Sequence, residues 1–97
     1  MAQKLIGVVG EMPQALIEPV QVGLFFKRTS SFAQLRTMTR WTALSVKLPR
    51  VVSSPSPRWQ VESVGSRHHH VFNLHDITDV TPAIIDLLWE AYDVDVR

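Results

Sequence analysis

The stretch RWQVESVGSRHHHVFNL, residues 58–74, decides the class of fold that this sequence predicts. Its first part, residues 58–64, alternates strictly between the two sides of an extended chain, which is the period of a β-strand. Gly65 and Ser66 are turn residues, and residues 67–74 have the composition of a second strand. The stretch therefore predicts a β-hairpin, and with it an antiparallel sheet.

The segment after this hairpin is the clearest helix in the sequence. Asp79 or Thr81 can cap its N-terminus, and Pro82 suits the first helical position because its missing N–H has no partner there. Its acidic residues share one face: Asp86, Glu90 and Asp93. Its apolar residues share the other: Ile84, Ile85, Leu88, Trp89 and Tyr92. We expect this apolar face to anchor the helix against the sheet, mainly through Ile85, Leu88, Trp89 and Tyr92.

The N-terminal quarter has the composition of two strands. Residues 4–9 are apolar and partly β-branched, and Gly10 follows them. Residues 15–27 also predict a strand, with VQVGLFF, residues 20–26, as its firmest part. Pro19 cannot donate a hydrogen bond to a neighbouring strand, so it marks a sheet edge, a bulge or the true start of this strand.

The middle of the chain predicts a short helix and then a strand. The apolar residues Phe32, Leu35 and Met38, followed by Trp41 or Thr42, recur at helical spacing after a Ser30 or Ser31 cap, which indicates a helix over residues 31–42. The threonines of this segment lower its helix propensity, and a strand is the alternative. Residues 42–53 are rich in Val and Leu and predict a strand that Pro49 breaks or borders. Residues 53–57, SSPSP, predict a loop.

These elements together predict an α+β fold. It consists of a small antiparallel β-sheet, a C-terminal amphipathic helix and a second short helix, in one domain over residues 1–97. The loop at 53–57 is too short to separate domains, because each flank would be too small to fold alone. A ferredoxin-like order, with YDVDV (residues 92–96) as a terminal strand, is the alternative.

The composition excludes several classes of protein. There is no cysteine, which removes disulfide bonds, thiolate metal ligands and cysteine nucleophiles. No apolar run approaches the roughly 18 residues of a membrane span. The N-terminal region contains Glu11 and Glu18 and lacks the apolar core of a signal peptide. We therefore expect an intracellular protein, in the cytoplasm or within a particle, without a signal peptide or a transmembrane segment.

Charge is distributed unevenly along the chain. No acidic residue lies between Glu18 and Glu62. That interval holds seven bases: Lys27, Arg28, Arg36, Arg40, Lys47, Arg50 and Arg58. From Asn73 onward six acids face one base. We interpret the seven bases as contacts to a polyanion or to a protein partner, unless the two halves neutralise each other within the fold.

All four histidines lie within eight positions. On a strand, His68 and His70 share one face, which is a metal-ligand geometry, and His75 could add a ligand. These three are weak candidates, because no second cluster completes a structural site, so we predict no metal site and no cofactor. Protonation of the crowded imidazoles near pH 6 is a further alternative.

No catalytic motif is visible in the sequence. There is no G-x-S-x-G elbow, phosphate-binding loop or H-E-x-x-H pair. We therefore predict a non-enzymatic assembly subunit or interaction module of an oligomer, a viral particle or a larger complex, with protein partners. One alternative is a nucleic-acid-binding accessory protein that uses the basic and aromatic segment 25–59. Another is a metal-binding or pH-responsive protein that uses the histidines.

Overall fold

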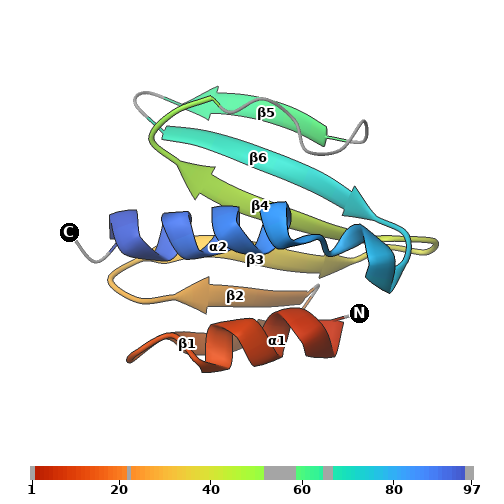
Figure 1. Cartoon of the computed structure of the whole chain (residues 1–97), viewed down its shortest axis with the longest axis horizontal. Coiled ribbons are helices and arrows are strands. Elements are labelled where there is room, and N and C mark those ends of the chain that lie inside the picture. The colour runs from red at the N-terminus through yellow and green to blue at the C-terminus, as the bar shows by residue number, and fades with distance from the viewer. Residues whose placement is uncertain (1, 22, 52–58, 65–66, 96–97) are drawn as a thin grey trace.

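The fold is a single antiparallel sheet with helices on one side (Figure 1). The computed structural model describes residues 2–21, 23–51, 59–64 and 67–95, and only the backbone of residues 59–64 and 67. The elements are, in chain order, α1 (Ala2–Gly10), β1 (Leu16–Val20), β2 (Gly23–Lys27), β3 (Ser31–Thr37), β4 (Thr42–Leu48), β5 (Trp59–Val64), β6 (Arg67–Leu74), the short 3-10 helix η1 (Ile77–Asp79) and α2 (Pro82–Asp95). The predicted α+β class, with an antiparallel sheet and a C-terminal helix, is confirmed.

The sheet has six strands in the order β1-β2-β3-β4-β6-β5. The first four strands follow one another as a meander, β6 pairs with β4, and β5 forms the far edge. The two predicted strands of the hairpin are present as the antiparallel pair β5 and β6, whereas Arg58 and the predicted turn at Gly65 and Ser66 lie outside the described residues. The predicted loop at 53–57 lies outside the described residues.

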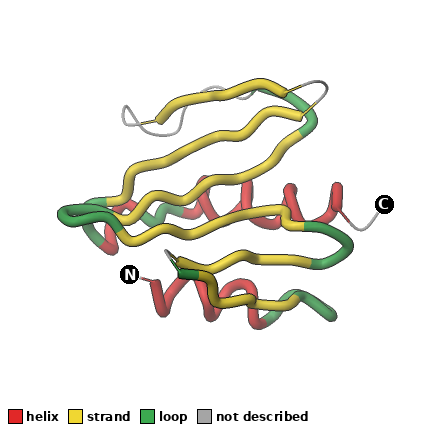
Figure 2. Tube along the Cα trace, turned by 180° about the vertical axis from the view of Figure 1, so that it is seen from behind, coloured by secondary structure: helices red, strands yellow, loops and turns green. Residues whose placement is uncertain are grey.

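The two helices lie on the same face of the sheet (Figures 1 and 2). Helix α2 packs on β3 and β4, and α1 packs beside β1. The core between the helices and the sheet consists mainly of fully buried side chains, among them Leu5, Val9, Phe26, Leu44, Val46, Leu48, Phe72, Ile84 and Leu88. In the described part of the chain, no element covers the opposite face of the sheet (Figure 2).

Helix α2 begins and packs as a capped amphipathic helix should. The hydroxyl of Thr81 accepts a hydrogen bond from the backbone N–H of Ile84, at 3.3 Å, which satisfies one of the free donors of the first turn. Leu88 and Tyr92 are buried. Ile85 and Trp89 are half-buried and pack at the margin of the core. The ferredoxin-like alternative was wrong, because residues 92–95 continue α2 and form no strand.

The prediction of a strand at residues 4–9 was wrong, because these residues lie in α1. The helix places Leu5 and Val9 one turn apart on the face that enters the core. The strand prediction rested on β-branched composition, which is a weak preference. Burial of one helical face outweighs it.

The prediction of a helix at residues 31–42 was also wrong, and the strand alternative is correct. Residues 31–37 form β3, and the chain then turns, with a hydrogen bond from the N–H of Met38 to the carbonyl of Trp41 at 2.8 Å. The register between β2 and β3 shifts at Phe26, so that Phe32 is an extra residue of β3. Phe32 is buried together with Leu35. The bulge therefore reproduces the three-residue spacing that suggested a helix.

The single strand predicted over residues 15–27 is a hairpin of β1 and β2. Val20 pairs with Gly23, so the chain reverses inside the VQVGLFF segment that we had expected to be one strand. Pro19 lies in β1, the outer strand on this side of the sheet, where the missing N–H is tolerated. The second helix of the fold is therefore α1, at the N-terminus.

Candidate binding surface on the uncovered face of the sheet

The strands present alternate residues to the two faces of the sheet. In β4, Leu44, Val46 and Leu48 are buried under the helices, whereas Ser45 and Lys47 are half-buried on the uncovered face. The register extends this division across the sheet, because Phe25 of β2 pairs with Gln34, Gln34 with Ser45, and Ser45 with Val71. The uncovered face thus carries a central row without charge from β2 to β6.

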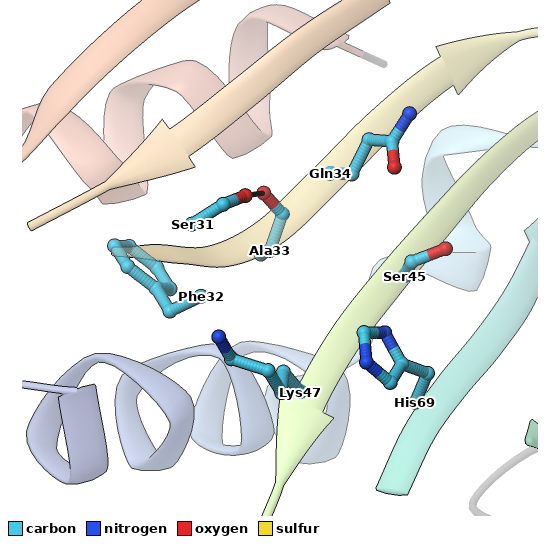
Figure 3. Close-up of a pocket in the computed structure, with 7 residues that line it drawn as sticks. All are labelled: Ser31, Phe32, Ala33, Gln34, Ser45, Lys47 and His69. Atoms are coloured by element: carbon cyan, nitrogen blue, oxygen red, sulfur yellow. Dashed lines mark hydrogen bonds between the residues drawn. The ribbon is translucent and has the colours of Figure 1, made fainter. Parts of the chain in front are cut away.

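A shallow depression lies on this face, between β3, β4 and β6 (Figure 3). Its volume is about 50 Å³, and its lining residues are Ser31, Phe32, Ala33, Gln34, Ser45, Lys47 and His69. Lys47 and His69 are direct neighbours in the register of β4 and β6. Five of the seven lining residues have polar side chains that can donate a hydrogen bond to a ligand.

Three of the predicted contact bases lie on strands around this depression. Lys27 forms an ion pair with Glu18 across β1 and β2, at 2.8 Å. Arg36 is exposed at the other end of β3, and its side chain makes no ion pair with another described residue. Lys47 donates a hydrogen bond to the hydroxyl of Ser30, at 3.2 Å. We call the uncovered side of the sheet, which carries Lys27, Arg36 and Lys47, the basic face.

The other predicted bases lie elsewhere. Arg28 lies in the β2–β3 turn and donates to the side chain of Gln14. Arg40 is exposed in the β3–β4 turn. Arg50 follows the end of β4, and its guanidinium group forms an ion pair with the carboxylate of Glu90 in α2 at 2.7 Å. Arg58 lies outside the described residues. The fold thus separates the six bases that lie within the described residues.

Helix α2, which carries the acidic residues, lies over the face of the sheet opposite the basic face (Figure 1). Asp86 and Asp93 are exposed and form no ion pair with another described residue. Glu90 pairs with Arg50. Among the described residues, the bases of the middle segment and the acids of α2 therefore neutralise each other only in part, and Asp86 and Asp93 are exposed to solvent.

The last acid of α2 is bound to the β2–β3 turn. The carboxylate of Asp95 accepts hydrogen bonds from the backbone N–H groups of Thr29, at 2.8 Å, and Ser30, at 3.0 Å, and from the hydroxyl of Ser30. Burial alone would raise the pKa of Asp95, but these hydrogen bonds and the charge of Lys47 hold the pKa below its ordinary value. Asp95 is therefore a well-bound anion at the end of the helix.

The structure separates the histidines that were weak metal candidates. His70 is fully buried, His69 lines the depression, and His75 follows β6 and stacks on Trp41 with ring centroids 5.8 Å apart. Among the described residues, no three potential ligands gather in a geometry that could hold a metal ion. His68 and His70 stay on one strand, and His75 does not join them.

His70 is the one charged or polar residue among the buried side chains described. Its Nδ1–H donates to the backbone carbonyl of His68 at 3.1 Å, and its ring stacks on Phe72. Burial disfavours the imidazolium form and lowers the pKa of His70 below its ordinary value, although the hydrogen bond to His68 opposes this shift. We therefore assign His70 to the core.

A comparison with protein families gives one match, which covers residues 1–95 and is described as a domain of unknown function, DUF5655. The chain belongs to this family. Neither the curated proteins nor the solved structures give a match. Within the described part of the chain, neither helix of this DUF5655 domain combines the length and the apolar character that a membrane crossing requires.

Sequence reasoning missed three residues of the surface of this DUF5655 domain. Gln34 and Ser45 line the depression, and Asp95 binds the neighbouring turn. The alternation of TALSVKL, residues 42–48, was a signal for Ser45, since it places Ser45 and Lys47 on the side away from three apolar residues. Gln34 was missed because its segment was predicted to be a helix, so it was not assigned to a face of the sheet. The contact of Asp95 joins residues that are 66 positions apart, and no local pattern reports it.

Proposed function

We propose that this protein is a non-enzymatic assembly module in which the basic face of one molecule binds the exposed side of α2 of another. The observation that carries the proposal is the arrangement of charge on opposite sides of the sheet. Lys27, Arg36 and Lys47 lie on the uncovered face. Asp86 and Asp93 are exposed residues of α2, and α2 lies over the other face of the sheet (Figure 1). One molecule therefore offers both halves of a complementary contact.

This contact is heterologous, because two different surfaces meet. Such interfaces repeat from molecule to molecule and form rings or open chains. Complementary charges orient the partners and speed their encounter, whereas apolar side chains supply much of the affinity. Phe25 is half-buried on the basic face, and Leu16 of β1 is 63% exposed. These two side chains are the apolar surface that a partner would cover.

The test is light scattering or sedimentation at low and high protein concentration. We expect the average mass of the natural protein to rise with concentration and to fall when salt is added. Arg36→Glu should weaken association at least about tenfold, because it places like charges opposite each other. The pair Asp86→Asn and Asp93→Asn should weaken it from the other side.

A mixture of the two altered proteins distinguishes this geometry from others. Each altered protein keeps one intact surface, so the mixture should form dimers and nothing larger. Lys4→Glu, on the exposed side of α1, is the matched control and should leave association unchanged. A natural protein that stays monomeric at every concentration contradicts self-assembly.

A second candidate function, the binding of single-stranded nucleic acid, is favoured by the row of Phe25, Gln34 and Ser45. An aromatic ring, an amide and a hydroxyl are groups that stack on bases and hydrogen-bond to them. Lys27 and Lys47 border this row on one side and Arg36 on the other. Binding of a labelled single strand, measured across a salt series, tests this candidate. Absence of salt-dependent binding even at about 50 mM salt rejects it.

A further inference from the structure

The β2–β3 turn is built to hold an anion. The backbone N–H groups of Thr29 and Ser30 and the hydroxyl of Ser30 converge on the Asp95 carboxylate. Lys47 adds a positive charge, because its ammonium group donates to the same hydroxyl at 3.2 Å. Successive backbone N–H groups that point to one spot form an anion-binding concavity, and a nearby lysine strengthens it.

The position of the Asp95 carboxylate in α2 is electrostatically unfavourable. Asp95 lies at the C-terminal end of α2, where the helix dipole repels negative charge. The last turn of α2 contains no basic residue to offset that repulsion. Thr29 and Ser30 are exposed, so water and small solutes can reach the site. An external anion can therefore compete with the Asp95 carboxylate for the same donors.

The site continues into the depression on the basic face. Lys47 belongs to both, since it lines the depression (Figure 3) and also donates a hydrogen bond to the hydroxyl of Ser30. Lys47 therefore connects the turn to the depression, which Gln34, Ser45 and His69 also line. These side chains offer an amide, a hydroxyl and an imidazole for further hydrogen bonds.

We propose that Thr29, Ser30 and Lys47 form a binding site for the phosphate or carboxylate group of an external ligand, and that Asp95 is an internal ligand that competes for it. Binding of the external group releases the end of α2 from the sheet. The proposal goes beyond the assembly function. The two share Lys47, but their tests are separate, because association is tested at Arg36, Asp86 and Asp93 and anion binding is tested at Asp95.

The experiment follows the backbone N–H signals of Thr29 and Ser30 by NMR while inorganic phosphate is added at constant ionic strength. Asp95→Ala removes the competitor, and we expect it to raise the apparent phosphate affinity at least about tenfold. Glu11→Ala, which removes an exposed acid that follows α1 and belongs to neither proposed surface, is the matched control and should behave as the natural protein. Adding Lys47→Gln to Asp95→Ala should abolish the gain.

A parallel titration with acetate identifies the group that the site prefers. A response to both anions assigns the site to any oxyanion, and a response to phosphate alone assigns it to phosphate. Asp95→Asn, which keeps a hydrogen-bond acceptor in the turn, serves if Asp95→Ala does not fold. The proposal is overturned if the folded variants show no movement of the Thr29 and Ser30 signals at about 50 mM of either anion. It is also overturned if Asp95→Ala and Glu11→Ala respond equally.

Discussion

The two faces of the sheet are built from neighbouring residues of the same strands, yet they differ in burial and in polarity. Leu44 and Val46 of β4 are fully buried under α2, and Ser45 between them lies half-buried beside the depression. One face holds the fold together, and the other is available for recognition. Because the side chains of a strand alternate, a shift of one residue in register would exchange the two roles.

The largest effect should come from a cavity under α2. Leu44→Ala removes a fully buried side chain and should lower the free energy of unfolding by about 2–5 kcal/mol. Ser45→Ala, one residue further on, should change it by less than about 0.5 kcal/mol. Urea denaturation of both variants measures the difference. Equal decreases in the free energy of unfolding would mean that the uncovered face contributes to stability as much as the buried face does.

The next effect concerns the backbone between β2 and β3. A Cβ at Gly23 would lie 1.9 Å from the carbonyl oxygen of Leu35, so Gly23→Ala must displace one strand. We expect a loss of about 1–3 kcal/mol, as for other overpacked sites. Gly7→Ala in α1 is the control, because nothing lies within 4 Å of its Cβ. It should stabilise the protein by about 0.5–1 kcal/mol, since alanine is the better helix former. A destabilised Gly7→Ala protein would contradict the assignment of α1.

The smallest effect is a pH dependence of the free energy of unfolding, which we expect from His70 and not from the adjacent His69. Since the pKa of His70 is lowered in the fold, the unfolded chain binds the proton more readily. Stability is therefore complete above about pH 6.5, where a free imidazole is neutral, and decreases as the pH falls below that value. The slope should reach at most about 1.4 kcal/mol per pH unit. His68 and Arg50 lower the pKa of His70 further, and Glu90 opposes them.

Chemical denaturation between about pH 5 and pH 8 measures this slope. His70→Leu should be less stable than the natural protein at neutral pH and should lose most of the slope. His69→Gln, on the uncovered face, should keep the slope. If His70→Leu and the natural protein show the same slope, the proton uptake belongs to other groups.

The sequence by itself determined the hairpin of β5 and β6, the helix α2 and hence the α+β class. These elements carry their signals within a few residues: strict alternation beside a Gly-Ser turn, and an apolar face after Thr81 and Pro82. It also determined the identity of the basic residues. Local patterns are sufficient wherever one element buries one regular face.

Only the tertiary structure decided the conformation of α1 and β3 and the grouping of the basic face. Residues 4–9 are helical because this conformation buries Leu5 and Val9 together in the core. Phe32 suggested helical spacing in the sequence because a bulge in β3 buries it next to Ala33. The contact of Asp95 with Ser30 depends on where α2 ends on the sheet. Such outcomes follow from contacts between distant residues, whose free energy exceeds the small differences in local preference between helix and strand.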